Sequence, residues 1–125
     1  MIRWFEKNKV VSLVITLWIA FTIFYISSLV IIPSPGIKID VIPVVYHITA
    51  FFFLAIFLFI SVLERKWNLK NIILSLALVS LYAILDELHQ SFVPGRVASF
   101  SDFLLDFNGI AFASLIYFIL ILRKK

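Results

Sequence analysis

The chain has 125 residues, of which 63% are hydrophobic and 14% are charged, and its formal net charge is +4. A mean hydropathy of +1.12 lies far outside the range of soluble domains, and the length leaves room for one compact unit. We therefore expect a single membrane domain over residues 1–125. The chain contains no cysteine, which excludes disulfides, cysteine-ligated metals and thiolate catalysis.

Four continuous apolar runs follow one another, and each has roughly the 20 residues that a helix needs to cross a ~30 Å hydrocarbon layer. The runs do not alternate as strands would, and an open sheet cannot satisfy its edges in lipid. The sequence thus predicts an all-α bundle of four transmembrane helices, over approximately residues 10–32, 42–63, 71–93 and 101–122. The first run is longer than a signal peptide's apolar segment and lacks a cleavage site, so we expect a retained anchor.

The basic residues lie mainly on one side of the predicted bundle. Nine of the eleven precede the first run, separate the second run from the third, or follow the fourth, and only Lys38 and Arg96 fall in the other connections. The positive-inside rule then predicts that both termini are cytoplasmic. These basic residues flank the apolar runs and do not form one basic face with aromatic side chains on which bases could stack. This distribution argues against a nucleic-acid partner.

Polar side chains are expected to meet near the opposite side of the membrane. At a rise of 1.5 Å per residue, Ser27 and Ser28 lie ~26 Å along the first helix, and His47, Asp86 and Asp106 lie ~22–24 Å from the basic flank. All four helices thus bring polar groups to one level. A buried carboxyl costs ~2.5–3.5 kcal/mol near the membrane centre and less toward the interface, so these acids need partners.

Helical geometry predicts the directions in which these polar side chains point from the third and fourth helices. At 100° per residue, the polar residues that end the third helix span an arc of ~160°, so protein or water must surround this helix end. On the fourth helix, Asp102 and Asp106 share one stripe with Gly109 and Ala113. The last two residues form a small-xxx-small pair, which lets another helix approach closely below the acids.

Two reactive chemistries would use these residues. The first is acid–base catalysis, with Glu87 or Asp86 as the base and His47 or His89 as its partner. The second is a divalent metal bound by the two histidines and by carboxylates, although no HExxH or similar signature accompanies them.

Two further interpretations involve no reaction. Arg96, which follows a Pro-Gly turn, could clamp a phosphate or carboxylate with its planar guanidinium, or form a salt bridge to Asp102. The polar residues could also form a buried hydrogen-bond network that only fixes helix packing.

The stretch DELHQSFVPGRVASFSDFLLDFNGI, residues 86–110, resembles the signature of the VanZ-like family of small bacterial integral membrane proteins. The shared elements are an acid pair, His-Gln, Pro-Gly-Arg, a serine and an aspartate that opens the last helix. The pair Ser27 and Ser28 and the early His47 in YHITAFFFLAIF also fit, so the resemblance covers essentially the whole chain. Two features depart from the pattern: Asp40 follows Lys38 where an Asp-Lys pair is usual, and the PSPG loop replaces a shorter proline segment.

The resemblance implies a bacterial source and a link to low-level resistance to the glycopeptide teicoplanin, while the predicted topology places the polar site on the outer face of the membrane. The expected partners are the lipid bilayer and an envelope lipid, a lipid-linked cell-wall intermediate or the glycopeptide. An enzyme and a non-catalytic binding or partner protein both stay open. The candidate catalytic residues are Asp86, Glu87, His89, His47 and Asp102. The candidate substrate-binding residues are Arg96, Gln90, Ser99 and Asp106.

Overall fold

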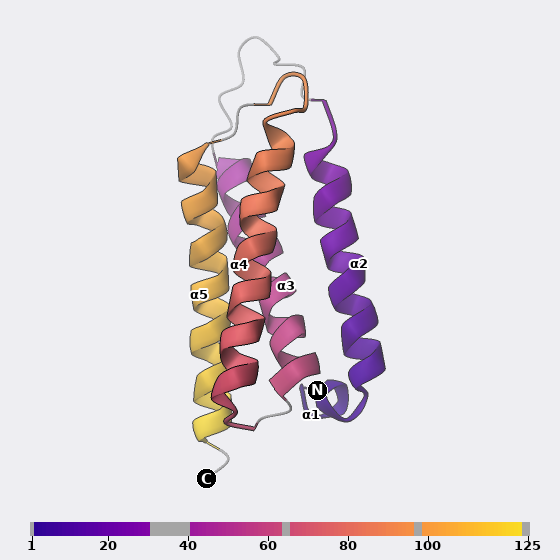
Figure 1. Ribbon diagram of the computed structural model, residues 1–125, viewed down its shortest axis with the longest axis vertical. Helices are drawn as coiled ribbons and strands as arrows, with labels where there is room; N and C mark the ends of the chain where they lie inside the picture. The colour runs from indigo at the N-terminus through magenta and orange to yellow at the C-terminus, as the bar shows by residue number, and fades with distance from the viewer. Residues whose placement is uncertain (1, 31–40, 64–65, 97–98, 124–125) are drawn as a thin grey trace.

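The computed structural model describes residues 2–30, 41–63, 66–96 and 99–123, and in these ranges it contains helices and turns but no strand (Figure 1). Four long helices each run antiparallel to the next. They are α2 (Lys9–Ser27), α3 (Val41–Leu63), α4 (Leu69–Gln90) and α5 (Phe100–Leu122). Each is long and apolar enough to cross a membrane. The predicted all-α bundle of four spans is confirmed, and the chain is a multi-pass membrane protein.

A short fifth helix, α1 (Ile2–Lys7), precedes the bundle and was not predicted. Six residues are too few for a periodic pattern, and a helix this short needs tertiary contacts to form. Those contacts exist here. The Ser12 hydroxyl donates to the Phe5 carbonyl at 2.7 Å, and the Phe5 ring packs edge-on against Phe57 with ring centroids 5.3 Å apart.

Two of the predicted helix ends are wrong, because apolar sequence continues beyond the helices. α2 ends at Ser27 instead of residue 32, and α4 ends at Gln90 instead of residue 93. After α4 the chain turns through Gly95, whose φ of 82° lies in the left-handed region that favours glycine. α4 also begins two residues early, since the Asn68 side chain caps it by accepting from the Asn71 N–H at 3.2 Å. The starts of α3 and α5 differ from the prediction by one residue.

α3 is the central helix of the bundle. It contacts α1, α2, α4 and α5, and its contact with α5 is the most extensive. Gly109 of α5 allows this close approach, because a Cβ there would collide with the Ile48 carbonyl oxygen and lie 2.9 Å from the Phe52 nitrogen. Ala113, one turn further along, is fully buried. The predicted small-xxx-small contact is therefore confirmed, and its partner is α3.

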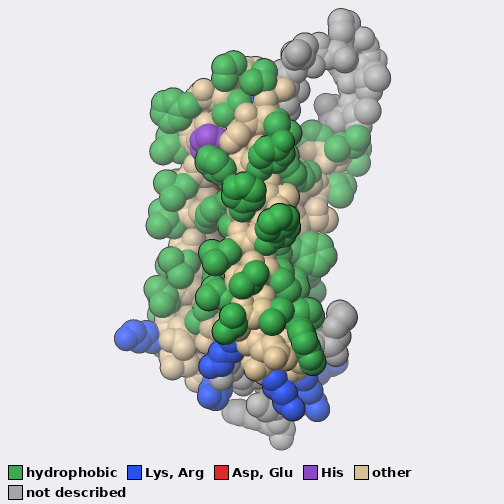
Figure 2. Space-filling view, turned by 90° about the vertical axis from the view of Figure 1, so that its right-hand side faces the viewer, with side chains coloured by type: hydrophobic (Ala, Val, Ile, Leu, Met, Phe, Trp, Pro, Cys, Tyr) green, Lys and Arg blue, Asp and Glu red, His purple; other side chains and the backbone are tan. Residues whose placement is uncertain are grey.

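The surface of the bundle is that of a protein surrounded by lipid. Figure 2 shows hydrophobic side chains along the length of the bundle and lysine and arginine gathered at one end. Large side chains such as Trp18, Phe21 and Phe112 are more than half exposed. We call the end with these basic residues the basic end and the opposite end the polar end. The described basic residues of the basic end are Arg3, Lys7, Lys9, Lys66, Lys70 and Arg123.

Several residues that entered the sequence argument lie outside the described residues. They are Lys38, Asp40, the PSPG segment, and the basic residues at positions 65, 124 and 125.

Candidate functional site

Polar side chains from all four long helices come together near the polar end, as the helix heights predict. They form two groups on different sides of α4. The central cluster consists of His47 from α3, Glu87 from α4 and Asp106 from α5. The α2–α4 network consists of Ser27, Ser28, Asp86, His89, Gln90 and Arg96.

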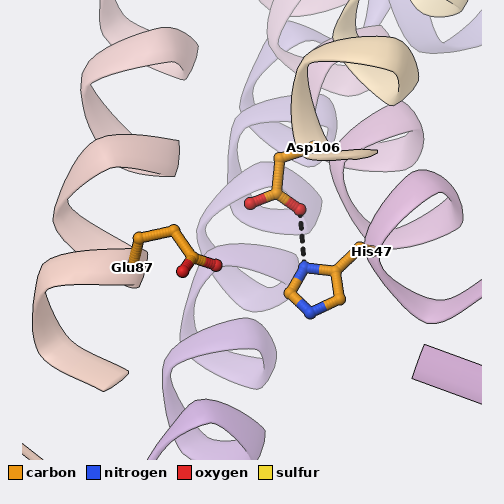
Figure 3. Close-up of side chains that lie close together, drawn as sticks. All are labelled: His47, Glu87 and Asp106. Atoms are coloured by element: carbon orange, nitrogen blue, oxygen red, sulfur yellow. Dashed lines mark hydrogen bonds and ion pairs between the residues drawn. The ribbon is translucent and has the colours of Figure 1, made fainter. Parts of the chain in front are cut away.

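The central cluster is buried between three helices, and its side chains point toward one another (Figure 3). His47 Nδ1 and Asp106 Oδ1 are 2.8 Å apart, and these two residues are 4% and 0% exposed. Glu87 is 8% exposed, and one nitrogen or oxygen atom from each of the three residues lies within 4.8 Å of the others. The close contact at Gly109, one turn from Asp106 and beside Ile48, holds the His47–Asp106 pair together.

Two carboxyl oxygens in this cluster lack a partner. Glu87 Oε2 accepts a hydrogen bond from the Ser99 backbone N–H at 3.1 Å. Glu87 Oε1 and Asp106 Oδ2 are buried and make no hydrogen bond to any described residue. Leaving a buried acceptor unsatisfied costs ~1–3 kcal/mol, and more if the group is charged. The cluster is therefore built to take up a proton, a cation or a polar ligand.

The α2–α4 network, by contrast, is connected by hydrogen bonds among its own members. Gln90 Nε2 donates to Asp86 Oδ2 at 2.8 Å and, less favourably, to Ser27 Oγ at 3.4 Å. Gln90 Oε1 in turn accepts from Arg96 Nη1 at 3.3 Å. Asp86, predicted as a catalytic base, is thus hydrogen-bonded within its own helix, and this network joins α4 to α2.

His89 also faces α2. Its Nε2 lies 2.9 Å from Ser28 Oγ, and its ring packs on Phe24 with centroids 4.6 Å apart. The sequence suggested that the two histidines share a metal site. In the structure His47 is grouped instead with Glu87 and Asp106, because α4 directs His89 and Glu87 toward different neighbours.

Arg96 closes the end of α2. Its Nη2 donates to the Ile26 carbonyl at 2.7 Å and its Nε donates to the Leu29 carbonyl at 3.3 Å. Carbonyls at a helix C-terminus lack intrahelical partners and carry the negative end of the helix dipole, which suits a guanidinium. No ion pair joins Arg96 to Asp102, although the structure describes both, so the alternative of a salt bridge between them is not supported. This capping explains why α2 ends earlier than its apolar sequence suggests.

Ser99 and Asp102 belong to the start of α5. The Ser99 side chain caps the helix by accepting from the Ser101 N–H at 3.2 Å, while its own N–H reaches Glu87. Asp102 is half-buried in the first turn, where a carboxylate complements the helix dipole. Both positions therefore have a structural explanation, and Ser99 approaches the central cluster through its backbone.

Tyr46 is a polar residue near the site that the sequence argument missed. Its hydroxyl is buried without a hydrogen-bond partner among the described residues, and its ring lies edge-on to His47 at 5.5 Å. It also lines a largely apolar groove of about 390 Å³ between α2 and α3, together with Trp18 and Phe53. In the sequence, the only feature that could have marked Tyr46 as a site residue was its position next to His47 in an otherwise apolar run.

A second groove leads from the outside of the bundle to Glu87. It has a volume of about 370 Å³ and is lined by Ile84, Glu87, Ser99, Phe100 and Phe103. Glu87 is the one charged residue of this lining, and the aromatic and aliphatic walls suit a hydrocarbon chain. The groove therefore places an acid where an amphipathic molecule in the membrane could meet it.

Comparison with protein families gives a match to the VanZ/LLP1 family model over residues 3–122. This range includes all four spans, the Pro-Gly-Arg turn and both polar groups described above. Comparison with curated proteins found no match, and neither did comparison with solved structures. Because the matched range covers nearly the whole chain, this multi-pass membrane protein belongs to the VanZ/LLP1 family.

Proposed function

We propose that the chain binds and chemically alters an amphipathic molecule of the bacterial cell envelope, namely a lipid or a lipid-linked cell-wall intermediate. The observation that carries this proposal is the position of Glu87. Its carboxyl reaches the buried His47–Asp106 pair on one side and lines the apolar groove between α4 and α5 on the other. A substrate whose hydrocarbon chain lies in this groove would bring its polar headgroup to Glu87.

The residues of the central cluster have the roles that acid–base catalysis needs. Asp106 orients the His47 ring through a hydrogen bond, as carboxylates commonly do for catalytic imidazoles. Glu87 has one oxygen held by the Ser99 N–H and one that is buried without a partner, so the second oxygen could accept a proton from a polar group that enters the cluster. Asp86, Gln90, Arg96 and His89 act at a distance by fixing α4 against α2.

We further propose that the polar end faces the outside of the cell. The basic end carries most of the lysine and arginine residues, and the positive-inside rule places such residues on the cytoplasmic side. The chain has no cysteine, so single reporters can be introduced. Ser91→Cys, at an exposed position at the polar end, should react with a membrane-impermeant maleimide on intact cells. Lys7→Cys, exposed at the basic end, should react only after lysis, and the reverse pattern would refute the proposed orientation.

An outward-facing site fits a link to glycopeptide tolerance, and Glu87→Gln tests it. We expect the wild type to raise the inhibitory concentration of teicoplanin, with vancomycin measured alongside, and Glu87→Gln to return it to the value of cells carrying an empty vector. The reason is that removal of an essential acid or base lowers a rate ~10²–10⁴-fold, although Gln keeps the shape of the side chain. Membrane levels of the two proteins must be matched.

Glu6→Gln is the matched control, because Glu6 lies in α1 at the basic end and its change should leave tolerance intact. Mass spectrometry of envelope lipids from the same cells should reveal a species that depends on Glu87. If Glu87→Gln retains full tolerance at matched levels, acid–base catalysis at this residue is rejected. If it lowers the protein level instead, the cluster serves folding.

A non-catalytic binding or partner protein is the second candidate function. The observation that favours it is the α2–α4 network, in which Arg96 donates to Gln90 and Gln90 donates to Asp86, so that these residues form a hydrogen-bonded scaffold. This candidate predicts that Glu87→Gln retains part of the tolerance, because binding by shape survives an isosteric change, and that no lipid species depends on Glu87.

A further inference from the structure

We infer that His47, Glu87 and Asp106 form a binding site for one divalent transition-metal cation of the zinc type. This goes beyond the proposed function, which needs only proton transfer at Glu87 Oε1, an oxygen that a bound metal would occupy instead. The three residues come from three different helices and direct a nitrogen and carboxyl oxygens into one buried space (Figure 3).

The dimensions of the cluster suit a metal after a small contraction. Protein ligands lie ~2.0–2.2 Å from zinc, so any two of them are at most ~4.4 Å apart. The ligand atoms of the cluster lie within 4.8 Å of one another, and a metal bound by His47 Nδ1 would replace the 2.8 Å hydrogen bond from this nitrogen to Asp106 Oδ1. The flexible Glu87 side chain can supply the required contraction, at least about 0.4 Å from 4.8 Å to ~4.4 Å, through its torsions.

The unpartnered oxygens point to a cation as the ligand. Glu87 Oε1 and Asp106 Oδ2 are buried in different helices and both lack a hydrogen-bond partner among the described residues. Neither the Ser99 N–H nor the His47 ring satisfies these two oxygens, because each contacts the other oxygen of its carboxyl group. One divalent cation would satisfy both oxygens at once and balance the charge of two ionised carboxylates.

The donor set indicates the class of metal. Magnesium and calcium prefer six or more oxygen ligands, whereas an imidazole with two carboxylates suits zinc and neighbouring first-row ions. Three protein ligands leave at least one position open, which is typical of catalytic zinc sites. Such a position, close to the groove beside Glu87, would take a water molecule or an anionic headgroup oxygen.

The chain is well suited to a direct binding test, because it has two histidines and no cysteine and therefore few adventitious zinc ligands. Tag-free protein in detergent is stripped with a chelator, titrated with Zn²⁺ by calorimetry and assayed for bound metal. We expect one zinc ion per wild-type chain and a melting temperature that rises with zinc concentration. Co²⁺ should give the visible absorption of a low-coordinate site.

Two pairs of matched variants locate the site. Glu87→Gln and His47→Gln should weaken zinc binding by at least about tenfold, since loss of even an outer contact commonly weakens a metal site 10–100-fold. Asp86→Asn and His89→Gln should retain binding, because these residues belong to the α2–α4 network. Circular dichroism establishes that each variant is folded before it is titrated.

The inference is overturned if wild-type protein binds no zinc and gains no thermal stability from it. It is also overturned if Glu87→Gln and His47→Gln bind zinc as tightly as the wild type. Its failure can be told from failure of the proposed function, because zinc is measured on purified protein and tolerance is measured in cells. Glu87-dependent tolerance without zinc binding would leave metal-free acid–base catalysis standing.

Discussion

Asp106→Leu is expected to lower the stability of the bundle by about 1–3 kcal/mol, the usual cost of leaving one member of a buried hydrogen-bonded pair without its partner. Asp106 is fully buried and its Oδ1 lies 2.8 Å from His47 Nδ1. After the change, His47 keeps its polar ring between α3 and α5 with no replacement acceptor. Unfolding in detergent, followed by circular dichroism against temperature, measures the loss.

The double variant His47→Leu, Asp106→Leu shows whether the pair serves stability or function. Replacing both members of a buried pair by apolar residues is often neutral or stabilising, so the double variant should recover most of the lost stability. Teicoplanin tolerance should stay lost, because no imidazole remains beside Glu87. A double variant that regains tolerance would show that the pair only supports folding. A single variant as stable as the wild type would contradict the buried pair itself.

Gly109→Ala is the second change with a large expected effect. In a helix interior, alanine is ordinarily more favourable than glycine by about 1 kcal/mol. Here the added Cβ would collide with the Ile48 carbonyl oxygen and crowd the Phe52 nitrogen, and both are backbone atoms that cannot rotate away. We expect a net loss of about 1–3 kcal/mol, as for other overpacked contacts, and a lower melting temperature.

The same change should impair the site, because moving α5 away from α3 separates Asp106 from His47. Tolerance at matched protein level should therefore fall along with stability. Ala111→Val is the matched control, since Ala111 is exposed on the same helix and its two added methyl groups lie away from the Gly109 contact. A Gly109→Ala variant with a raised melting temperature would mean that the two backbones are further apart than described.

The long helices could be predicted from the sequence because lipid imposes a length and an apolar composition on every span. The ends of α2 and α4 could not, since apolar residues continue past them and the stop comes from distant contacts. Arg96 caps α2 from a turn that is 70 residues away from Ile26 in the chain. α1 was missed for the same reason, because its partners lie in α2 and α3.

The membership of the polar layer could also be predicted, because the rise of a helix fixes the height of each residue. The height of a residue along its helix does not determine which helices are neighbours or how far each helix is rotated about its own axis. The choice of His47, Glu87 and Asp106 as one cluster, with His89 outside it, depends on the packing of α5 against α3 and of α4 against α2. Chain order does not indicate that packing.

The pairing of α3 with α5 also bears on how the protein is made. Spans enter the bilayer in chain order, and helices associate after insertion. α3 is the second of the four spans and its most extensive contact is with the fourth, so the α3 face that packs on α5 stays uncovered by it until α5 has entered. During this interval His47 faces the membrane without Asp106. The central cluster is thus completed only when the fourth span has entered and supplied Asp106.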